Sequence, residues 1–149
     1  ELNSVDNKKY TLSKLRGNVV ILNFWATWCG PCRMEIPDFN ELYLKNKDDG
    51  LIILGISSDN SKSALVNFLK TYEVHYPILY GSVSQISKIS NDYGGIFALP
   101  TSIIIDRKGE IKRIYPSAIL KDYTPSIYSA FIYDLESALR STENKTDKE

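Results

Sequence analysis

The apolar residues of this chain fall into two kinds of pattern, which alternate along the sequence. Residues 18–25 and 51–57 form nearly continuous apolar runs with many β-branched side chains, as is typical of strands buried on both faces of a sheet. Between and after these runs, apolar residues recur every three or four positions, which indicates amphipathic helices. This spacing predicts helices over residues 31–45, 61–72, 83–93 and 125–140.

Shorter extended segments complete the pattern. A hairpin is predicted over residues 1–10, a strand over 76–80 and a second hairpin over 100–115. The first hairpin is followed by a helical turn near residues 13–15, which Ser13 is placed to cap. Strands that alternate with helices, followed by a terminal hairpin and helix, predict an α/β fold with a central mixed β-sheet flanked by helices.

The size and charge of the chain limit the number of domains and the kinds of partner that we expect. Its 149 residues suffice for one domain with a real core, so we expect a single domain over 1–141 and a polar, frayed tail over 142–149. Lys plus Arg equals Asp plus Glu at 18 each, and this balance gives no reason to expect a nucleic-acid partner. No apolar run approaches the roughly 20 residues that span a bilayer. A signal peptide or membrane anchor would lie outside this sequence, which begins with Glu1.

The two cysteines, Cys29 and Cys32, lie in the stretch FWATWCGPCRMEIP. A structural zinc site needs four ligands and a catalytic one about three, whereas this chain adds only His75 and scattered carboxylates. We therefore expect no metal. A structural bridge is also disfavoured, because the stabilisation that a disulfide gives grows with the length of the loop it closes. The remaining hypothesis is a redox-active dithiol.

The position of the pair supports the dithiol hypothesis. Cys29 follows a predicted strand and begins a predicted helix, where unpaired N–H groups and the helix dipole favour a thiolate. Cys32 lies one turn further in and should be less exposed. We therefore expect Cys29 to attack a substrate disulfide and Cys32 to resolve the mixed disulfide that forms.

The sequence around the pair resembles a known group of proteins. FWATWCGPC resembles the active site of the thioredoxin superfamily, and NFWATWCGPCRMEIP resembles its extracytoplasmic TlpA/ResA/CcmG-type branch. The likeness covers roughly residues 10–115, including FLKTYEVHYPIL and LPTSIIIDRKGEI. It implies a thioredoxin fold with an N-terminal hairpin and a central helix–strand insertion. It also implies a thiol–disulfide oxidoreductase that works outside the cytoplasm and needs no cofactor beyond its redox-active disulfide.

The resemblance also implies a substrate surface. The Leu99–Pro100 bond would be cis and face the dithiol, with the Leu99 backbone pairing with an extended substrate segment. Without the resemblance, Pro100 reads as an ordinary trans proline that opens a strand. Trp28, Gly30 and Pro31 would complete this surface. The implied partners are protein disulfide substrates, such as apocytochrome c, and an upstream membrane thiol reductant, with the protein itself a monomer.

Glu35 is the second candidate for chemistry. It is either one more exposed helix charge or, because it follows Cys32 by three residues, a carboxyl beneath the buried sulfur. In that position desolvation would raise its pKa and let it exchange a proton with the Cys32 thiol. Thioredoxin has an aspartate where this chain has Asn23, which cannot ionise. This difference strengthens the case for Glu35, as does the glutamate that similar proteins of this branch carry here.

The sequence says less about the direction of electron flow than about the fold. The Gly-Pro dipeptide between the cysteines matches reductants, so we expect a protein-disulfide reductase. The rival enzymes are a disulfide-forming oxidase or isomerase and a peroxidase, although no P-x-x-x-T-x-x-C stretch is present. A non-catalytic binding module of the same fold is the rival from another class. Where relatives carry a groove-lining glycine, this chain has a longer loop with Ile119 and Leu120, which would shape the groove for a particular partner.

Overall fold

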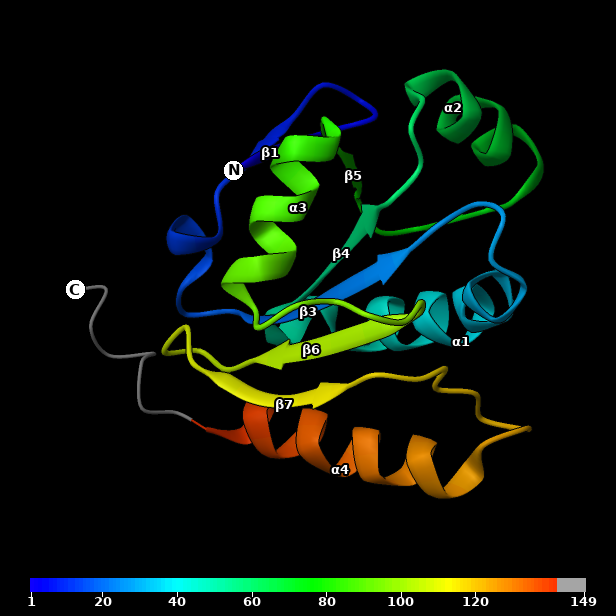
Figure 1. Cartoon of the computed structure of the whole chain (residues 1–149). Coiled ribbons are helices and arrows are strands. Elements are labelled where there is room, and N and C mark those ends of the chain that lie inside the picture. The colour runs from blue at the N-terminus through cyan, green and yellow to red at the C-terminus, as the bar shows by residue number, and fades with distance from the viewer. Residues whose placement is uncertain (142–149) are drawn as a thin grey trace.

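Seven strands form one mixed sheet in the computed structural model, which describes residues 1–141 (Figure 1). The strand order is β2-β1-β5-β4-β3-β6-β7. The strands are β1 (Leu2–Ser4), β2 (Lys9–Tyr10), β3 (Val19–Trp25), β4 (Leu51–Ser57), β5 (Ile78–Tyr80), β6 (Thr101–Ile105) and β7 (Ile111–Tyr115). β3 pairs in parallel with β4 and antiparallel with β6, so the predicted mixed sheet is confirmed. The predicted tail lies outside the described residues.

The helices agree with the predicted ranges to within one or two residues. They are α1 (Gly30–Asn46), α2 (Lys62–Thr71), α3 (Val83–Asp92) and α4 (Pro125–Arg140), with short 3-10 helices η1 (Leu12–Leu15) and η2 (Lys47–Asp49). The prediction that Ser13 caps η1 is wrong, because the N-cap residue is Thr11 and it makes no side-chain cap. The turn begins earlier because Leu12 and Leu15 pack against the core.

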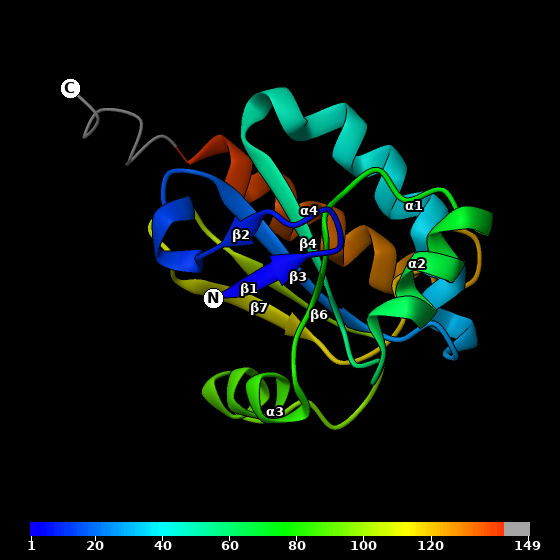
Figure 2. The same ribbon diagram turned by 90° about the horizontal axis from the view of Figure 1, so that it is seen from above.

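The two faces of the sheet are covered unequally. Side chains of successive strand residues point to opposite faces, and β3 is buried along its whole length. Its side chains at Ile21 and Trp25 join the core cluster that includes residues of α1, α2 and α4. Those at Leu22 and Phe24 join the opposite cluster, which is packed under α3 (Figure 2). By this alternation the Asn23 side chain faces α1.

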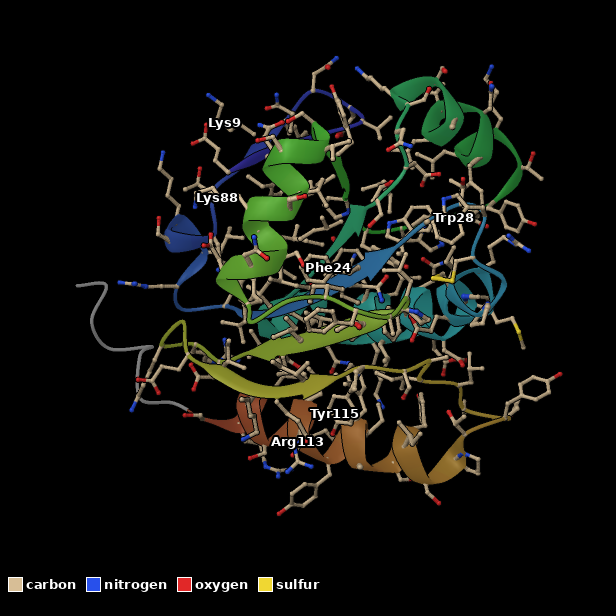
Figure 3. The ribbon with its side chains drawn as sticks, in the orientation of Figure 1. Lys9, Phe24, Trp28, Lys88, Arg113 and Tyr115 are labelled. Carbon is tan, nitrogen blue, oxygen red and sulfur yellow. A yellow bond between two sulfur atoms is a disulfide. The ribbon has the colours of Figure 1, made fainter. Side chains whose placement is uncertain are left out.

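The parallel pair β3–β4 determines where the cysteines lie. Both strands end at the same edge of the sheet, Trp25 being level with Ser57. The loop after β3 leads directly into α1, and the loop after β4 begins with Ser58 and Asp59. Such an edge, outside the carboxyl ends of parallel strands, is where α/β proteins commonly bind their ligands. Figure 3 shows the disulfide at this edge, close to Trp28.

Candidate active site around the Cys29–Cys32 dithiol

Cys29 and Cys32 form a disulfide at the first turn of α1. Cys29 is the N-cap residue, and its Sγ accepts a hydrogen bond from the backbone N–H of Cys32 at 3.3 Å. Cys29 is 7% exposed and Cys32 2%, so the predicted difference in exposure is confirmed. In the reduced protein the same N–H and the helix dipole favour a thiolate on Cys29.

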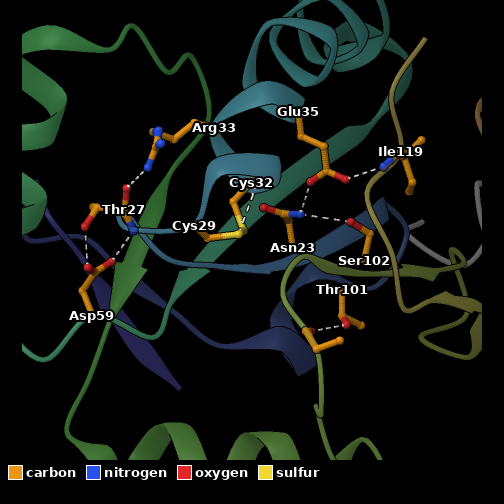
Figure 4. The surroundings of a disulfide bond; sticks show 11 residues. Asn23, Thr27, Cys29, Cys32, Arg33, Glu35, Asp59, Thr101, Ser102 and Ile119 are labelled. Carbon is orange, nitrogen blue, oxygen red and sulfur yellow. Dashed lines mark hydrogen bonds between the residues drawn. A yellow bond between two sulfur atoms is a disulfide. The ribbon is translucent and has the colours of Figure 1, made fainter. Parts of the chain in front are cut away.

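Glu35 lies inside the protein, with 1% of its surface exposed. Its two carboxyl oxygens accept hydrogen bonds from Asn23 Nδ2 at 3.0 Å and from the backbone N–H of Ile119 at 2.8 Å (Figure 4). Burial raises the pKa of Glu35 to about 8, although both hydrogen bonds favour the ionised form and act in the opposite direction. The alternative of an exposed surface charge is therefore wrong.

Asn23 links the glutamate to the sheet. Its amide nitrogen donates one hydrogen bond to Glu35 and a second to Ser102 Oγ, also at 3.0 Å. Asn23 and Ser102 are direct cross-strand partners on β3 and β6, so the register of the sheet orients the amide. Sequence reasoning missed two members of this network. Ser102 could have been noticed as a polar residue inside an apolar strand, whereas Ile119 contributes only backbone and gives no side-chain signal.

The Leu99–Pro100 peptide bond is cis, as the resemblance implied. Thr101 closes the turn by donating its hydroxyl to the carbonyl of Ala98 at 2.7 Å. Leu99 lines the same groove as Cys29, whereas Pro100 itself is buried. The loop before β6 therefore reaches the dithiol from the opposite side to α1.

The remaining candidates all lie at the surface, fully or partly exposed. Trp28 and Pro31 line the groove with Cys29, and Trp28 is 69% exposed. Gly30, between the cysteines, is partly exposed. His75 lies away from the dithiol in the loop before β5 and faces Glu73. Within residues 1–141 no group of three or more His, Cys, Asp or Glu side chains is arranged to hold a metal ion.

A polar cluster absent from the sequence-based predictions holds the segment before Cys29. Asp59 accepts hydrogen bonds from the Thr27 N–H at 2.9 Å, the Thr27 hydroxyl at 2.5 Å and the Ser57 hydroxyl at 2.8 Å. Arg33 Nη1 donates to the Thr27 carbonyl at 2.8 Å. We call these four residues the Thr27 clamp. It satisfies both backbone groups of Thr27 with side chains of opposite charge and so fixes the segment between β3 and the dithiol.

The Thr27 clamp should contribute measurably to stability. Asp59→Ala leaves the donors of Thr27 and Ser57 without their acceptor, and we expect the free energy of unfolding in urea to fall by about 2 kcal/mol. Asp59→Asn keeps one acceptor oxygen and should lose less than half of that. If the free energy of unfolding of Asp59→Ala lies within about 0.5 kcal/mol of that of the unaltered protein, the Thr27 clamp does not stabilise the segment.

A CxxC disulfide that begins a helix, opposite a cis-proline loop on a mixed sheet, defines a thioredoxin-fold protein with a redox dithiol. The chain belongs to the AhpC/TSA family, whose sequence profile matches residues 1–114. No helix of the described residues is long and apolar enough to span a bilayer.

Comparison with known proteins confirms the predicted branch. A thiol–disulfide oxidoreductase ResA of Bacillus cereus is 39% identical over 107 residues, which cover 72% of this chain and 60% of that protein. The chain thus matches about 60% of the length of this relative. The structure of a thioredoxin-family thiol:disulfide interchange protein from Chlorobium tepidum TLS superposes with a TM-score of 0.77 at 30% identity, covering 92% of this chain and 90% of that one. The exposed lipoprotein thioredoxin Etrx1 of Streptococcus pneumoniae superposes with a TM-score of 0.69 at 26% identity, covering 87% and 97%.

Proposed function

We propose that this protein is a thiol–disulfide oxidoreductase that reduces disulfides of other proteins through Cys29 and Cys32. The observation that supports it most directly is the asymmetry of the pair. Cys29 lies at the helix N-terminus and opens on a groove, and Cys32 is buried one turn further in. A two-step exchange requires one sulfur that a substrate can reach, as Cys29 can from the groove, and a second sulfur behind it that attacks only the first.

The exchange uses the two electrons of the reduced dithiol. The Cys29 thiolate attacks one sulfur of the substrate disulfide, forms a mixed disulfide and releases the other substrate sulfur as a thiolate. Cys32 then loses its proton and attacks Cys29 Sγ. This step forms the Cys29–Cys32 disulfide and releases the second substrate sulfur. The substrate has gained two electrons, and the protein is left in the oxidised form.

Glu35 is our candidate for accepting the proton that Cys32 must lose. It follows Cys32 by one helical turn, and burial raises its pKa to about 8, near the range in which thiols titrate. A carboxylate with such a pKa can take a proton from the thiol as it attacks and return it to a Cys32 thiolate when the disulfide is opened again. Asn23 cannot do so, because an amide has no titratable proton in this range.

The names of the relatives support our proposals for the partners and the location. ResA proteins are named as thiol–disulfide oxidoreductases, and the pneumococcal relative is described as an exposed lipoprotein. We propose that this chain works outside the cytoplasm as a monomer. Its clients would be protein disulfides, with apocytochrome c thiols as one candidate class. A membrane protein with a dithiol of its own would return the two electrons, so the protein needs no cofactor besides Cys29 and Cys32.

The direction of transfer can be tested with a pair of assays. The reduced protein, regenerated by dithiothreitol, should reduce the disulfides of insulin in many turnovers. The oxidised protein should form disulfides in a reduced, unfolded protein more slowly than DsbA does, because a thioredoxin-like pair differs from DsbA by roughly 150 mV, or about 7 kcal/mol for two electrons. Rapid oxidation with slow reduction would favour the disulfide-forming alternative. No exchange in either direction would favour a non-catalytic binding module.

A further inference from the structure

A groove of about 810 Å³ opens beside the dithiol, away from Glu35. One wall is the segment around Cys29, and the opposite wall is the last two turns of α3 together with the loop that leads to the cis-proline. Cys29 lines this groove and Cys32 does not. A substrate sulfur that meets Cys29 from this side must therefore enter the groove. The volume lies in the range of sites that hold one small ligand, which suits a short segment of chain rather than a folded surface.

The groove is lined by uncharged side chains, some polar and some apolar. None of its lining residues, all within the described part of the chain, has a charged side chain, and the large apolar ones include Phe24, Trp28, Ile86, Ile96 and Phe97. A charged segment bound here would lose part of its hydration without gaining a lining side chain of opposite charge. An uncharged segment would lose nothing comparable.

Phe97 is the most exposed large apolar residue of the described chain, at 94%, and it shares the groove with Trp28. A single exposed apolar side chain needs no explanation, but two large aromatic ones bordering a groove that contains a reactive sulfur mark a binding surface. The ring of Phe97 also lies against the backbone of a nearby glycine. It lies over Gly95, where an added Cβ would come within 2.4 Å of its Cζ.

We propose that this groove selects its substrates by the residues beside the reacting cysteine, favouring uncharged segments with an aromatic or large aliphatic neighbour that packs between Phe97 and Trp28. The inference rests on the proposed function. The occupant is a short, unfolded segment of a client protein with its cysteine at Cys29. Glutathione disulfide, which carries several carboxylates, is correspondingly a poor substrate.

Peptide disulfides test the selection. Blocked pentapeptides in which the cysteine is flanked by Phe, Ala, Lys or Glu would be offered to the reduced protein, and kcat/KM compared. We expect the Phe-flanked peptide to react at least about tenfold faster than the Ala-flanked one, and the Lys- and Glu-flanked peptides and glutathione disulfide to be slowest. This order should persist when the salt concentration is raised, because no charge pair supports it.

Two variants locate the effect. Phe97→Ser should reduce the Phe-to-Ala preference to about twofold or less. Tyr133→Ser, which removes an aromatic side chain of 69% exposure on α4 outside the groove, should leave the preference unchanged. An undiminished preference in Phe97→Ser would overturn the proposal. So would equal rates for charged and Phe-flanked peptides.

Binding without electron transfer separates this inference from the proposed function. The same peptides with serine in place of cysteine should still bind the oxidised protein in the order Phe, then Ala, then Lys or Glu, as followed by tryptophan fluorescence. That order, in a protein that reduces no disulfide, would support the groove and overturn the reductase. Reduction of insulin with no binding order among these peptides would support the reductase and overturn the proposal for the groove.

Discussion

Cys32→Ser should stop turnover and leave the protein covalently joined to its substrate through Cys29. Without the second sulfur nothing attacks the mixed disulfide from within the protein, because serine is no nucleophile towards sulfur at neutral pH. Disulfide reduction should fall about a thousandfold or more. Non-reducing electrophoresis and mass spectrometry should find the protein carrying one substrate molecule, which dithiothreitol releases.

Cys29→Ser provides the matched control. The same single-atom change at the other sulfur should abolish turnover as completely but trap nothing, because the remaining thiol of Cys32 is buried. A substrate trapped on Cys32 in this variant would show that the roles of the two cysteines are exchanged. Turnover that survived Cys29→Ser would remove the dithiol from the reaction altogether.

The oxidised protein should lose stability as the pH rises from about 4.5 to about 8, because of Glu35. Burial raises the pKa of this carboxyl from 4.5 to about 8 in the folded protein. Between these values the unfolded chain has released the proton and the folded one still holds it. Unfolding therefore becomes more favourable as the pH rises, by up to about 1.4 kcal/mol per pH unit. Below 4.5 and above 8 the Glu35 contribution should be constant.

Glu35→Gln isolates this effect. Glutamine cannot accept from both Asn23 and Ile119 as the carboxyl does, so the variant carries a penalty of about 1–3 kcal/mol at every pH. The informative quantity is the slope of the free energy of unfolding against pH. The variant should gain stability relative to the unaltered protein across the window, as measured by urea unfolding at a series of pH values. Asp38, whose charge also raises the Glu35 pKa, supplies a control: Asp38→Asn should keep the slope. A slope that persists in Glu35→Gln would assign it to another group.

The fold could be predicted from sequence where local pattern determines structure. The runs at β3 and β4 are buried on both faces, and the spacing in α2 and α4 is helical. These elements lie within about one residue of the expected positions. The N-cap position of Cys29 follows from the same information, because it needs only the end of a strand and the start of a helix. The cis bond at Pro100 was implied by resemblance alone, because neither spacing nor composition distinguishes cis from trans.

The rest of the site depends on contacts between distant segments. Asp59 reaches Thr27 only because two parallel strands end at the same edge, and Ile119 reaches Glu35 across 84 positions of sequence. The burial of Glu35 could be expected from its spacing to Cys32, but the partners that hold it could not. Phe97 gave no signal in the sequence, since its exposure depends on how the loop after α3 lies.

The reduction potential of the Cys29–Cys32 pair tests the central claim most directly. It can be measured by equilibrating the protein with dithiothreitol or glutathione buffers and counting free thiols. A reductase of the proposed kind should have a value close to the roughly −270 mV of thioredoxin and below the roughly −200 to −230 mV of glutaredoxins. A value near the roughly −120 mV of DsbA would contradict the reducing role and make the protein a donor of disulfides.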